Sequence, residues 1–333
     1  MKKVAIVGAG LTGLSAATKL QGAFEVTILE KSRGVSGRAA TRRLEEIAFD
    51  HGAQYFTAYT QEVISLVQTW EEKGVIQQWN PNLVAIDSFS GEVTPKTNGP
   101  PRYVGVPTMT ALAKHLAEGQ NVIPSTFVKS IYLEDGKWVV ETEQGSQAER
   151  FDAVIVTIPR EQTQQILPEQ FCSQIPQVTH DACWALIVLF DQPLETSFES
   201  AFVNNSEVLS WITANTKPGR TGGHCAWVIH AHKEWSNLNL ELSPSEVQKP
   251  ILEEFLRVVN LACPNIAELP QIKNAMAQRW RYSKPKNSEN KGCVSFPEEK
   301  LVVCGDWMSG ARIEGALTSG RISAETLLSI FNT

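Results

Sequence analysis

The sequence predicts an α/β fold in which a parallel β-sheet flanked by helices is combined with a second, inserted sheet that is mainly antiparallel. Three observations predict this arrangement. A strand–helix–strand pattern opens the chain at residues 3–29. Nearly continuous apolar strands, typical of a buried parallel sheet, follow at 151–158 and 301–304. Several β-rich runs at turn-like spacing occupy residues 184–230 between them.

The opening unit holds a glycine-rich turn between its first strand and its helix. Residues 3–7 and 24–29 are apolar runs, and residues 11–20 have helical spacing. Glycines in such a turn let backbone amides approach a pyrophosphate at the helix N-terminus. Glu30 ends the second strand, where its carboxylate can accept hydrogen bonds from ribose hydroxyls. The unit predicts a Rossmann-type dinucleotide site whose turn residues are Gly8, Gly10, Leu11, Thr12 and Gly13.

The middle of the chain continues this pattern with helices and strands. Residues 61–73 are predicted to form an amphipathic helix, and another helix begins near Thr108. Glycine and proline interrupt the pattern between residues 81 and 107, where only short β pieces are expected. The strands predicted next are 121–133, 137–143 and 151–158, the last ended by Pro159.

The inserted sheet is predicted from residues 184–190, 208–214 and 225–230. A helix over 243–261 follows, and Ser243 and Glu246 have the spacing of a capping box at its start. The remaining predicted elements are strands at 271–282 and 301–304 and a closing helix at 315–330.

These elements divide the chain into two predicted domains. A discontinuous cofactor domain comprises residues 1–58, 104–165 and 275–333, and a substrate domain comprises residues 59–103 and 166–274. Both ends of the sequence therefore belong to the cofactor domain.

The stretch after Glu30 indicates FAD rather than NAD. Residues 31–43 carry five positive charges and two glycines, which implies a second loop that faces phosphate. Arg38 directly follows Gly37 and can offer its planar guanidinium to a pyrophosphate oxygen, as a longer, more enclosed dinucleotide requires. The other arginines of this stretch are expected to lie in solvent.

The C-terminal segment repeats a strand–acid–helix pattern. The apolar strand at 301–304 runs into Gly305 and Asp306, whose carboxylate can accept from a ribityl hydroxyl. The helix that begins near Gly315 would direct its positive dipole end toward the pyrimidine edge of a flavin, where reduction develops negative charge.

Four separated segments, which span nearly the whole chain, form a recognisable set. They are the turn at 8–13 with residues 30–38 (EKSRGVSGR), residues 50–57 (DHGAQYFT), residues 278–282 (QRWRY) and residues 305–321. Together they resemble the renalase-type branch of the flavin amine-oxidase superfamily. The Gly-Ala-Gln-Tyr and Trp-Arg-Tyr stretches point most narrowly to this branch, whereas the terminal segments are common to many FAD enzymes.

The resemblance implies a two-domain flavoprotein fold that holds FAD without a covalent link. It also implies an oxidase that passes hydride from dihydronicotinamide dinucleotides, reduced at the wrong ring position, to flavin N5, releasing NAD(P)+ and then forming hydrogen peroxide from dioxygen. Such a transfer needs alignment more than acid–base chemistry. The cofactor residues expected are Gly8, Gly10, Leu11, Thr12, Gly13, Glu30, Lys31, Gly37, Arg38, Gln54, Tyr55, Phe56, Val128, Gly305, Asp306, Arg312, Glu314, Gly315 and Ala316.

The substrate face is expected where residues 54–56 follow the chain reversal at Gly52. Trp280 and Tyr282 alternate on a strand and would present their rings on one face. For these aromatic residues, packing in the core is an equally good interpretation. His230 can act near the flavin or be a core histidine with satisfied hydrogen bonds. The candidate catalytic residues are Gln54, Tyr55, His230, Trp280 and Tyr282.

Composition excludes several other classes of protein. The formal net charge is −6 and no dense stripe of Lys and Arg occurs, which argues against nucleic acid as a partner. No apolar run approaches the roughly 18 residues of a membrane helix, so a cytoplasmic protein without a membrane partner is expected. The six cysteines are scattered and no metal site is expected. The expected partners are a small-molecule substrate and dioxygen, with a monomeric or weakly dimeric chain.

Three other functions share the predicted fold. An amine oxidase would use the same flavin frame with aromatic rings around a neutral amine, although no lysine is evident that would hold a water beside flavin N5. A dehydrogenase with another electron acceptor and a flavin-binding module without turnover remain further alternatives.

Overall fold

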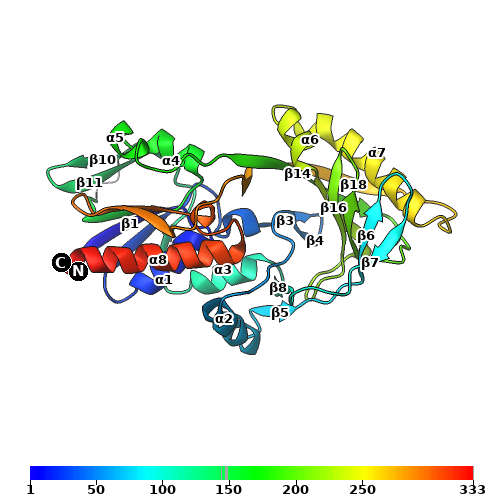
Figure 1. The fold of residues 1–333 in the computed structure, drawn as a ribbon, viewed down its shortest axis with the longest axis horizontal. Helices are drawn as coiled ribbons and strands as arrows, with labels where there is room; N and C mark the ends of the chain where they lie inside the picture. Colours follow the sequence, from blue (N-terminus) through cyan, green and yellow to red (C-terminus); the bar gives the residue numbers. More distant parts are fainter. Residues whose placement is uncertain (144, 147–148, 333) are drawn as a thin grey trace.

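A computed structural model of the chain describes residues 1–143, 145–146 and 149–332, which form two connected lobes, each built on one large sheet. Both termini lie at the outer end of the lobe that contains the six-stranded sheet (Figure 1). The long strands β14 (His180–Phe190) and β18 (Ile272–Pro285) lead into the seven-stranded sheet of the other lobe. The short strands β3 (Thr41–Leu44) and β4 (Ile47–Asp50) lie between the lobes.

The six-stranded sheet is parallel except at one edge, where β19 runs antiparallel to β20. Both of its faces are buried. On β1, Val4 and Ile6 pack among the helices of one face, whereas Ala5 and Val7 pack toward the three-stranded sheet on the other. In order its strands are β19 (Cys293–Phe296), β20 (Leu301–Cys304), β13 (Ala153–Val156), β1 (Lys3–Val7), β2 (Glu25–Leu29) and β9 (Asn121–Ile123).

The first and last helices pack closely together. Helix α1 (Leu11–Leu20) lies against α8 (Ile313–Asn332), as Figure 1 shows. A Cβ on Gly320 would lie 2.2 Å from the Thr12 carbonyl oxygen, so this approach requires glycine. Ser15 also donates a hydrogen bond to Leu317 O at 2.8 Å. The two ends of the sequence therefore form one structural unit.

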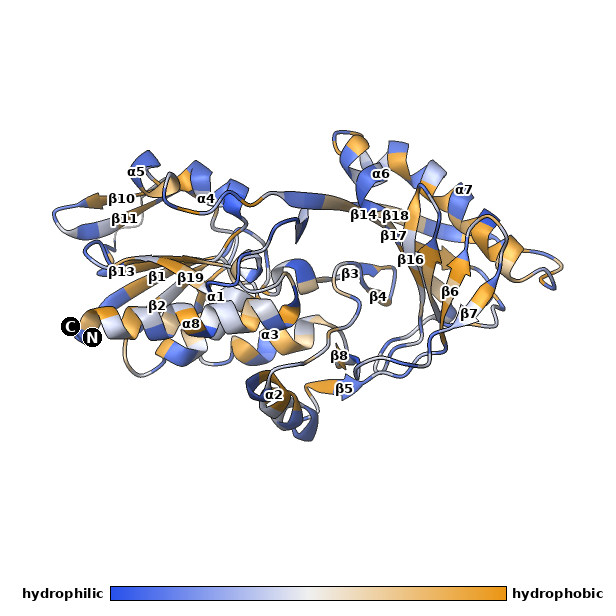
Figure 2. Cartoon of the chain, in the orientation of Figure 1, coloured by the Kyte–Doolittle hydropathy of each residue, from blue (hydrophilic) through white to orange (hydrophobic). Residues whose placement is uncertain are grey.

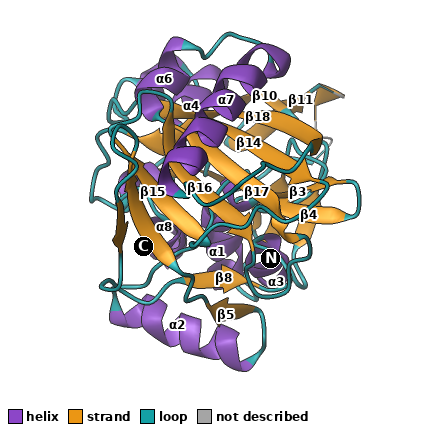
Figure 3. Cartoon of the chain, turned by 90° about the vertical axis from the view of Figure 1, so that its right-hand side faces the viewer, coloured by secondary structure: helices purple, strands orange, loops and turns teal. Residues whose placement is uncertain are grey.

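The seven-stranded sheet is mainly antiparallel and is covered on one face by helices (Figure 3). Helix α7 (Pro244–Ala262) contributes Val247, Ile251 and Phe255 to the core on that face. The capping box between Ser243 and Glu246 is formed as predicted. The strands in order are β18, β14, β17 (Gly223–Ala231), β16 (Leu209–Asn215), β15 (Ser200–Asn204), β6 (Leu83–Asp87) and β7 (Val93–Pro95).

Smaller elements complete the two lobes, and Figure 2 shows apolar residues along the central strands and mixed faces on the outer helices. None of the helices within the described residues is both long and apolar enough to span a membrane. The smaller elements are α2 (Gln61–Glu72), β5 (Ile76–Gln78), β8 (Tyr103–Gly105), α3 (Thr110–Leu116), β10 (Val128–Glu134), β11 (Lys137–Thr142), β12 (Gly145–Ser146), α4 (Arg160–Ile166), α5 (Glu169–Cys172) and α6 (Lys233–Leu238).

The predicted α/β fold class is confirmed, with differences in individual elements. The strand predicted over 121–133 is two strands, β9 and β10, because residues 124–127, which begin with a proline, leave the sheet. Helix α8 begins at Ile313, one position before Glu314 and two before the predicted start. Helix α4 directly follows Pro159 and was not predicted.

Candidate active site

The glycine-rich turn has the geometry that a pyrophosphate requires. Gly8 has a φ of +104°, and a Cβ on Gly13 would lie 2.0 Å from the Gly8 carbonyl oxygen, so neither position accepts a side chain without strain. At Gly10, in contrast, no atom lies within 4 Å of the place a Cβ would take. The turn is therefore tight toward the sheet and open on its outer side, as the close approach of a phosphate requires.

Glu30 is buried beside this turn and is held by it. One carboxylate oxygen accepts from Ala9 N and the other from Ser32 N, each at 2.8 Å. Each oxygen can still accept a further hydrogen bond, such as one from a ribose hydroxyl. A cavity of about 60 Å³ adjoins the carboxylate, and its lining includes Gly8, Lys31 and Val128. A larger hollow of about 700 Å³ near Lys3 lies at the opposite end of β1, away from these motifs.

Arg38 and Asp306, from opposite ends of the sequence, meet beside the turn. The Arg38 guanidinium lies 2.6 Å from the Asp306 carboxylate and donates a second hydrogen bond to Ser283 O at 2.9 Å. A Cβ on Gly37 would lie 3.4 Å from Gly10 Cα, so the second loop runs against the glycine-rich turn. Residues that were predicted separately are therefore in direct contact.

The start of α8 is tied to α2 through Glu314. Its carboxylate accepts from Tyr59 N at 3.1 Å, Thr60 N at 2.7 Å and Thr60 Oγ1 at 2.8 Å. The Arg312 guanidinium lies 5.2 Å from the centre of the Tyr59 ring. A Cβ on Gly315 would lie 2.2 Å from Ser309 O, which permits only glycine. In this structure, Glu314 therefore joins two helices, a structural contact that its sequence position did not indicate.

The backbone carbonyl of His51 brings two predicted substrate residues together. It accepts from Trp280 Nε1 at 3.0 Å and lies 3.2 Å from His230 Nε2. The His51 and Trp280 rings are 4.9 Å apart. Tyr282 does not join them, because a bulge in β18 disturbs the alternation, and its ring packs edge-on against His180 at 6.2 Å.

Gln54 is buried and links this group to a lysine that the sequence did not reveal. Its side-chain nitrogen donates to the carbonyls of Asp50 and Gly52, and its oxygen accepts from Lys217 Nζ at 3.0 Å. His230 Nε2 lies 3.4 Å from the Gln54 nitrogen. Lys217 lies in a loop between β16 and β17, where nothing in the local pattern predicts burial.

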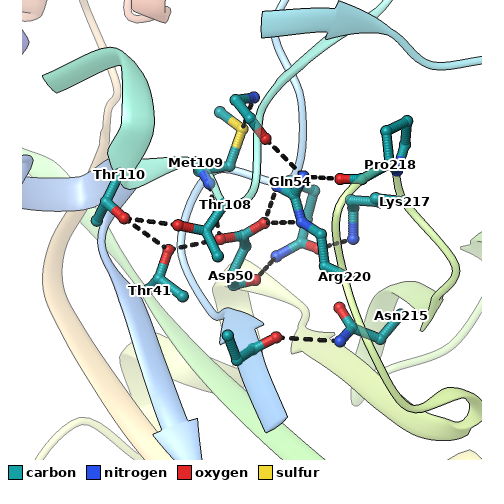
Figure 4. A network of polar contacts seen from close by, with 12 residues as sticks. Thr41, Asp50, Gln54, Thr108, Met109, Thr110, Asn215, Lys217, Pro218 and Arg220 are labelled. Carbon is teal, nitrogen blue, oxygen red and sulfur yellow. Dashed lines mark hydrogen bonds and ion pairs between the residues drawn. The ribbon is translucent and has the colours of Figure 1, made fainter. Parts of the chain in front are cut away.

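A buried ion pair fixes the loop that carries Lys217 (Figure 4). Arg220 forms two contacts with one Asp50 carboxylate oxygen, through Nη2 and through Nε at 3.0 Å, and neither side chain is exposed to solvent. The other Asp50 oxygen accepts from Met109 N at 3.0 Å and Thr41 Oγ1 at 2.6 Å. Asp50 therefore connects the loop to both β3 and α3.

Aromatic rings pack beside Gln54. Tyr55 lies 5.8 Å from Trp79 and 5.8 Å from Trp211, measured between ring centres. The ring of Phe56 packs on that of Tyr103, with their centres 5.7 Å apart. We call these three residues, Tyr55, Trp79 and Trp211, the aromatic cluster. The sequence predicted a role for Tyr55 but not for the two tryptophans.

Burial shifts the pKa of several titratable groups at this face. Burial lowers the pKa of His51 and of His230 to about 4, so both imidazoles are neutral. Burial also lowers the pKa of Lys217 to about 8, although the nearby Asp50 carboxylate opposes this shift. Burial raises the pKa of Cys304 to about 12, so its thiol is protonated and unsuited to attack on a cofactor. The face therefore offers hydrogen-bond donors and flat rings rather than a strong acid or base.

Comparisons with known proteins agree with this geometry. Residues 6–70 match the model of an NAD(P)-binding Rossmann-like domain, and residues 78–328 match that of flavin-containing amine oxidoreductases. Renalase from Mus musculus is 24% identical over 348 residues, which cover 96% of each chain.

Solved structures share the fold at low sequence identity. A proposed protoporphyrinogen oxidase from Exiguobacterium sp. 255-15 superposes with a TM-score of 0.75 at 15% identity, covering 100% of this chain and 99% of the other. A fatty acid isomerase from P. acnes that produces CLA superposes with a TM-score of 0.71 at 12% identity over 99% of both chains. With the family match over most of its length, the chain belongs to the flavin-containing amine oxidoreductases, as a renalase-like member and a flavin-dependent enzyme.

Proposed function

We propose that this enzyme is an FAD-dependent oxidase that converts misreduced dihydro-NAD(P) isomers to NAD(P)+ while dioxygen is reduced to hydrogen peroxide. The observation that carries the proposal is the similarity to renalase along almost the whole chain. The site supports it, because its flat rings and neutral hydrogen-bonding groups suit the alignment of a dihydronicotinamide ring.

The residues at the glycine-rich turn fit a non-covalently bound FAD. The open position at Gly10 and the Arg38 guanidinium would hold the two phosphates, and Glu30 would accept from the ribose. Val128 and Lys31 line the cavity beside Glu30, where the adenosine half would lie. When bound, the flavin supplies a two-electron acceptor that dioxygen can reoxidise.

The further cofactor contacts we propose come from the C-terminal segment and from the Gly52 reversal. Asp306 would accept from a ribityl hydroxyl, and the first turn of α8, with Gly305 before it, would lie near the flavin ring. The residues proposed for this surface are Leu11, Thr12, Gly13, Gly37, Phe56, Arg312, Glu314, Gly315 and Ala316.

The substrate face we propose consists of Gln54, Tyr55, His230 and Trp280, with Tyr282 farther along the same strand. His230 is neutral, so it would act as a hydrogen-bond partner that fixes a carboxamide. Trp280 would limit the space on one side of the substrate ring. Hydride transfer needs no proton from a strong acid. The role of these residues would therefore be to orient the substrate and to exclude water.

An amine oxidase is the second candidate, favoured by the family match and by the aromatic cluster. The two functions differ in the molecule that reduces the flavin. Anaerobic stopped-flow absorbance of the holoprotein, mixed in turn with borohydride-derived dihydronicotinamide isomers, ordinary NADH and a panel of amines, distinguishes them. We expect rapid bleaching by the isomers and peroxide after air is readmitted. Bleaching by an amine alone would instead establish the second candidate, and bleaching by none of them would exclude both.

A further inference from the structure

We infer that Arg102 and Lys217 bind an anionic group of the substrate, a phosphate or a carboxylate, beside the ring of Tyr55. This inference rests on the proposed function, whose dinucleotide substrate carries phosphates, and adds to it the two residues that select for an anion. The inference is based on unpartnered hydrogen-bond donors and on positive charges around the aromatic cluster.

Lys217 is a buried cation with a single hydrogen-bond partner. Its side chain is 2% exposed, its Nζ donates to Gln54 Oε1 at 3.0 Å, and it lies 5.2 Å from the centre of the Trp79 ring. Within the described residues, no carboxylate lies at ion-pair distance from it. An ammonium group has three donors, so two are left for a ligand. Burying a charge without a counter-charge costs several kcal/mol. Such groups therefore occur mainly where a bound ligand supplies the counter-charge.

Arg102 is a second cation without a carboxylate partner among the residues that the structure describes. Its guanidinium lies 5.5 Å from the centre of the Tyr55 ring. Its backbone carbonyl accepts from Trp79 N at 2.7 Å, which fixes Arg102 next to the same cluster. The two cations thus lie over Tyr55 and Trp79, whose rings are 5.8 Å apart.

A third donor at the cluster is also without a partner. Trp211 Nε1 is buried with no hydrogen bond to any described residue, and the residue is 6% exposed. Indole can only donate, so an acceptor from outside the chain would satisfy it. Two groups that can accept, Asn215 Oδ1 and Thr216 Oγ1, are also buried without a partner among the described residues. The Asn215 side-chain nitrogen donates to the carbonyls of Ala48 and Thr221.

The local charge balance favours an anion. Asp50 is the carboxylate of this polar network, and Arg220 already neutralises it. Lys217 and Arg102 therefore leave two positive charges at this face of a chain whose formal net charge is −6. An organic cation would meet like charges, of which that on buried Lys217 is little screened by water, whereas a phosphate or carboxylate would pair with both cations. A flat ring attached to that anion could pack on the aromatic cluster.

The test uses three ring compounds of nearly the same shape. Benzoate, benzamide and benzylamine carry charges of −1, 0 and +1 at neutral pH, and their dissociation constants with the holoprotein can be measured by flavin absorbance and by calorimetry. We expect benzoate to bind at least about tenfold more tightly than benzamide, with benzylamine weakest. Lys217→Met and Arg102→Gln should each reduce this preference about tenfold, whereas Lys217→Arg should keep it. Lys249→Met changes a lysine that is 81% exposed on α7 and should have no effect.

Several results would overturn the inference. They are equal binding of benzoate and benzamide, absence of benzoate binding at millimolar concentration, and an unchanged preference in the Arg102→Gln variant. None of these measurements requires turnover. A protein that selects benzoate but whose flavin is not bleached by any dihydronicotinamide isomer would refute the proposed function and leave the anion site standing.

Discussion

Replacing Asp50 with asparagine should destabilise the protein strongly, because the change leaves a buried guanidinium without its counter-charge. Neither Asp50 nor Arg220 exposes its side chain to solvent, and the carboxylate also accepts from Met109 N and Thr41 Oγ1. Removing one partner of a buried ion pair typically costs about 3–5 kcal/mol. For a chain of 333 residues the entropy of unfolding is about 0.7 kcal/mol/K, so the melting temperature should fall by about 4–7 °C.

Thermal and urea unfolding followed by circular dichroism, with FAD at saturating concentration, measures this effect. Glu253→Gln is the matched control, since it breaks an exposed i,i+4 pair with Lys249 and should cost less than about 0.5 kcal/mol. A double variant, Asp50→Leu with Arg220→Met, should recover much of the lost stability because it leaves no unpaired charge. A loss below about 1 kcal/mol for Asp50→Asn, or a loss equal to that of the control, would refute this reasoning.

Three further predictions concern the cofactor turn, a helix cap and pH. Gly13→Ala places a Cβ 2.0 Å from Gly8 O, so FAD affinity in equilibrium dialysis should fall at least about 100-fold, whereas Gly34→Ala, at an open position, should leave it unchanged. Ser243→Ala removes the capping box of α7 and should lower the unfolding free energy by about 1 kcal/mol in urea titrations; no change would show that the cap contributes nothing. The pKa values of His51 and His230 are lowered to about 4, below that of an unfolded histidine, so the unfolded state takes up protons first as pH falls. The contribution of these two neutral histidines to the unfolding free energy is therefore fully present above about pH 6.5. It should decrease between pH 6.5 and 4, by up to about 1.4 kcal/mol per pH unit for each histidine. In a His230→Gln variant the unfolding free energy should decrease less steeply with falling pH. An unchanged slope would contradict the claim that His230 is buried in its neutral form.

Local sequence patterns were enough to predict the elements that hold the flavin frame. Two such features are the turn at Gly8 to Gly13 and the cap at Ser243. Both depend on backbone conformation and on adjacent residues, so a few consecutive positions of the sequence are enough to predict them. The continuous apolar strands β1, β13 and β20 are buried on both faces, and this burial produces the pattern from which they were predicted.

The polar part of the site could not be predicted in the same way. Lys217 and Arg220 are single charged residues in a loop with proline and glycine, and only the folded chain brings them to Asp50 and Gln54. Their burial depends on contacts more than 150 residues away in sequence. A pattern with a period of a few residues contains no information on such contacts.

Two of the predicted site residues make tertiary contacts that the local pattern did not indicate. Tyr282 was expected to share a face with Trp280, but the bulge in β18 turns it toward His180. The cofactor contact expected of Glu314 stays a prediction, and the sequence did not indicate that its carboxylate accepts hydrogen bonds at the start of α2. In both cases another segment determines the direction of the side chain.

The central claim is that the two ends of the chain together hold one FAD. It is tested most directly by releasing the flavin from the purified protein, identifying it by chromatography, and measuring its affinity in wild type, Glu30→Ala and Asp306→Ala. We predict about one FAD per chain, with affinity lowered about 10-fold or more in each variant, since each loses a charged hydrogen-bond acceptor. FMN in place of FAD, no flavin at saturation, or wild-type affinity in both variants would contradict the account.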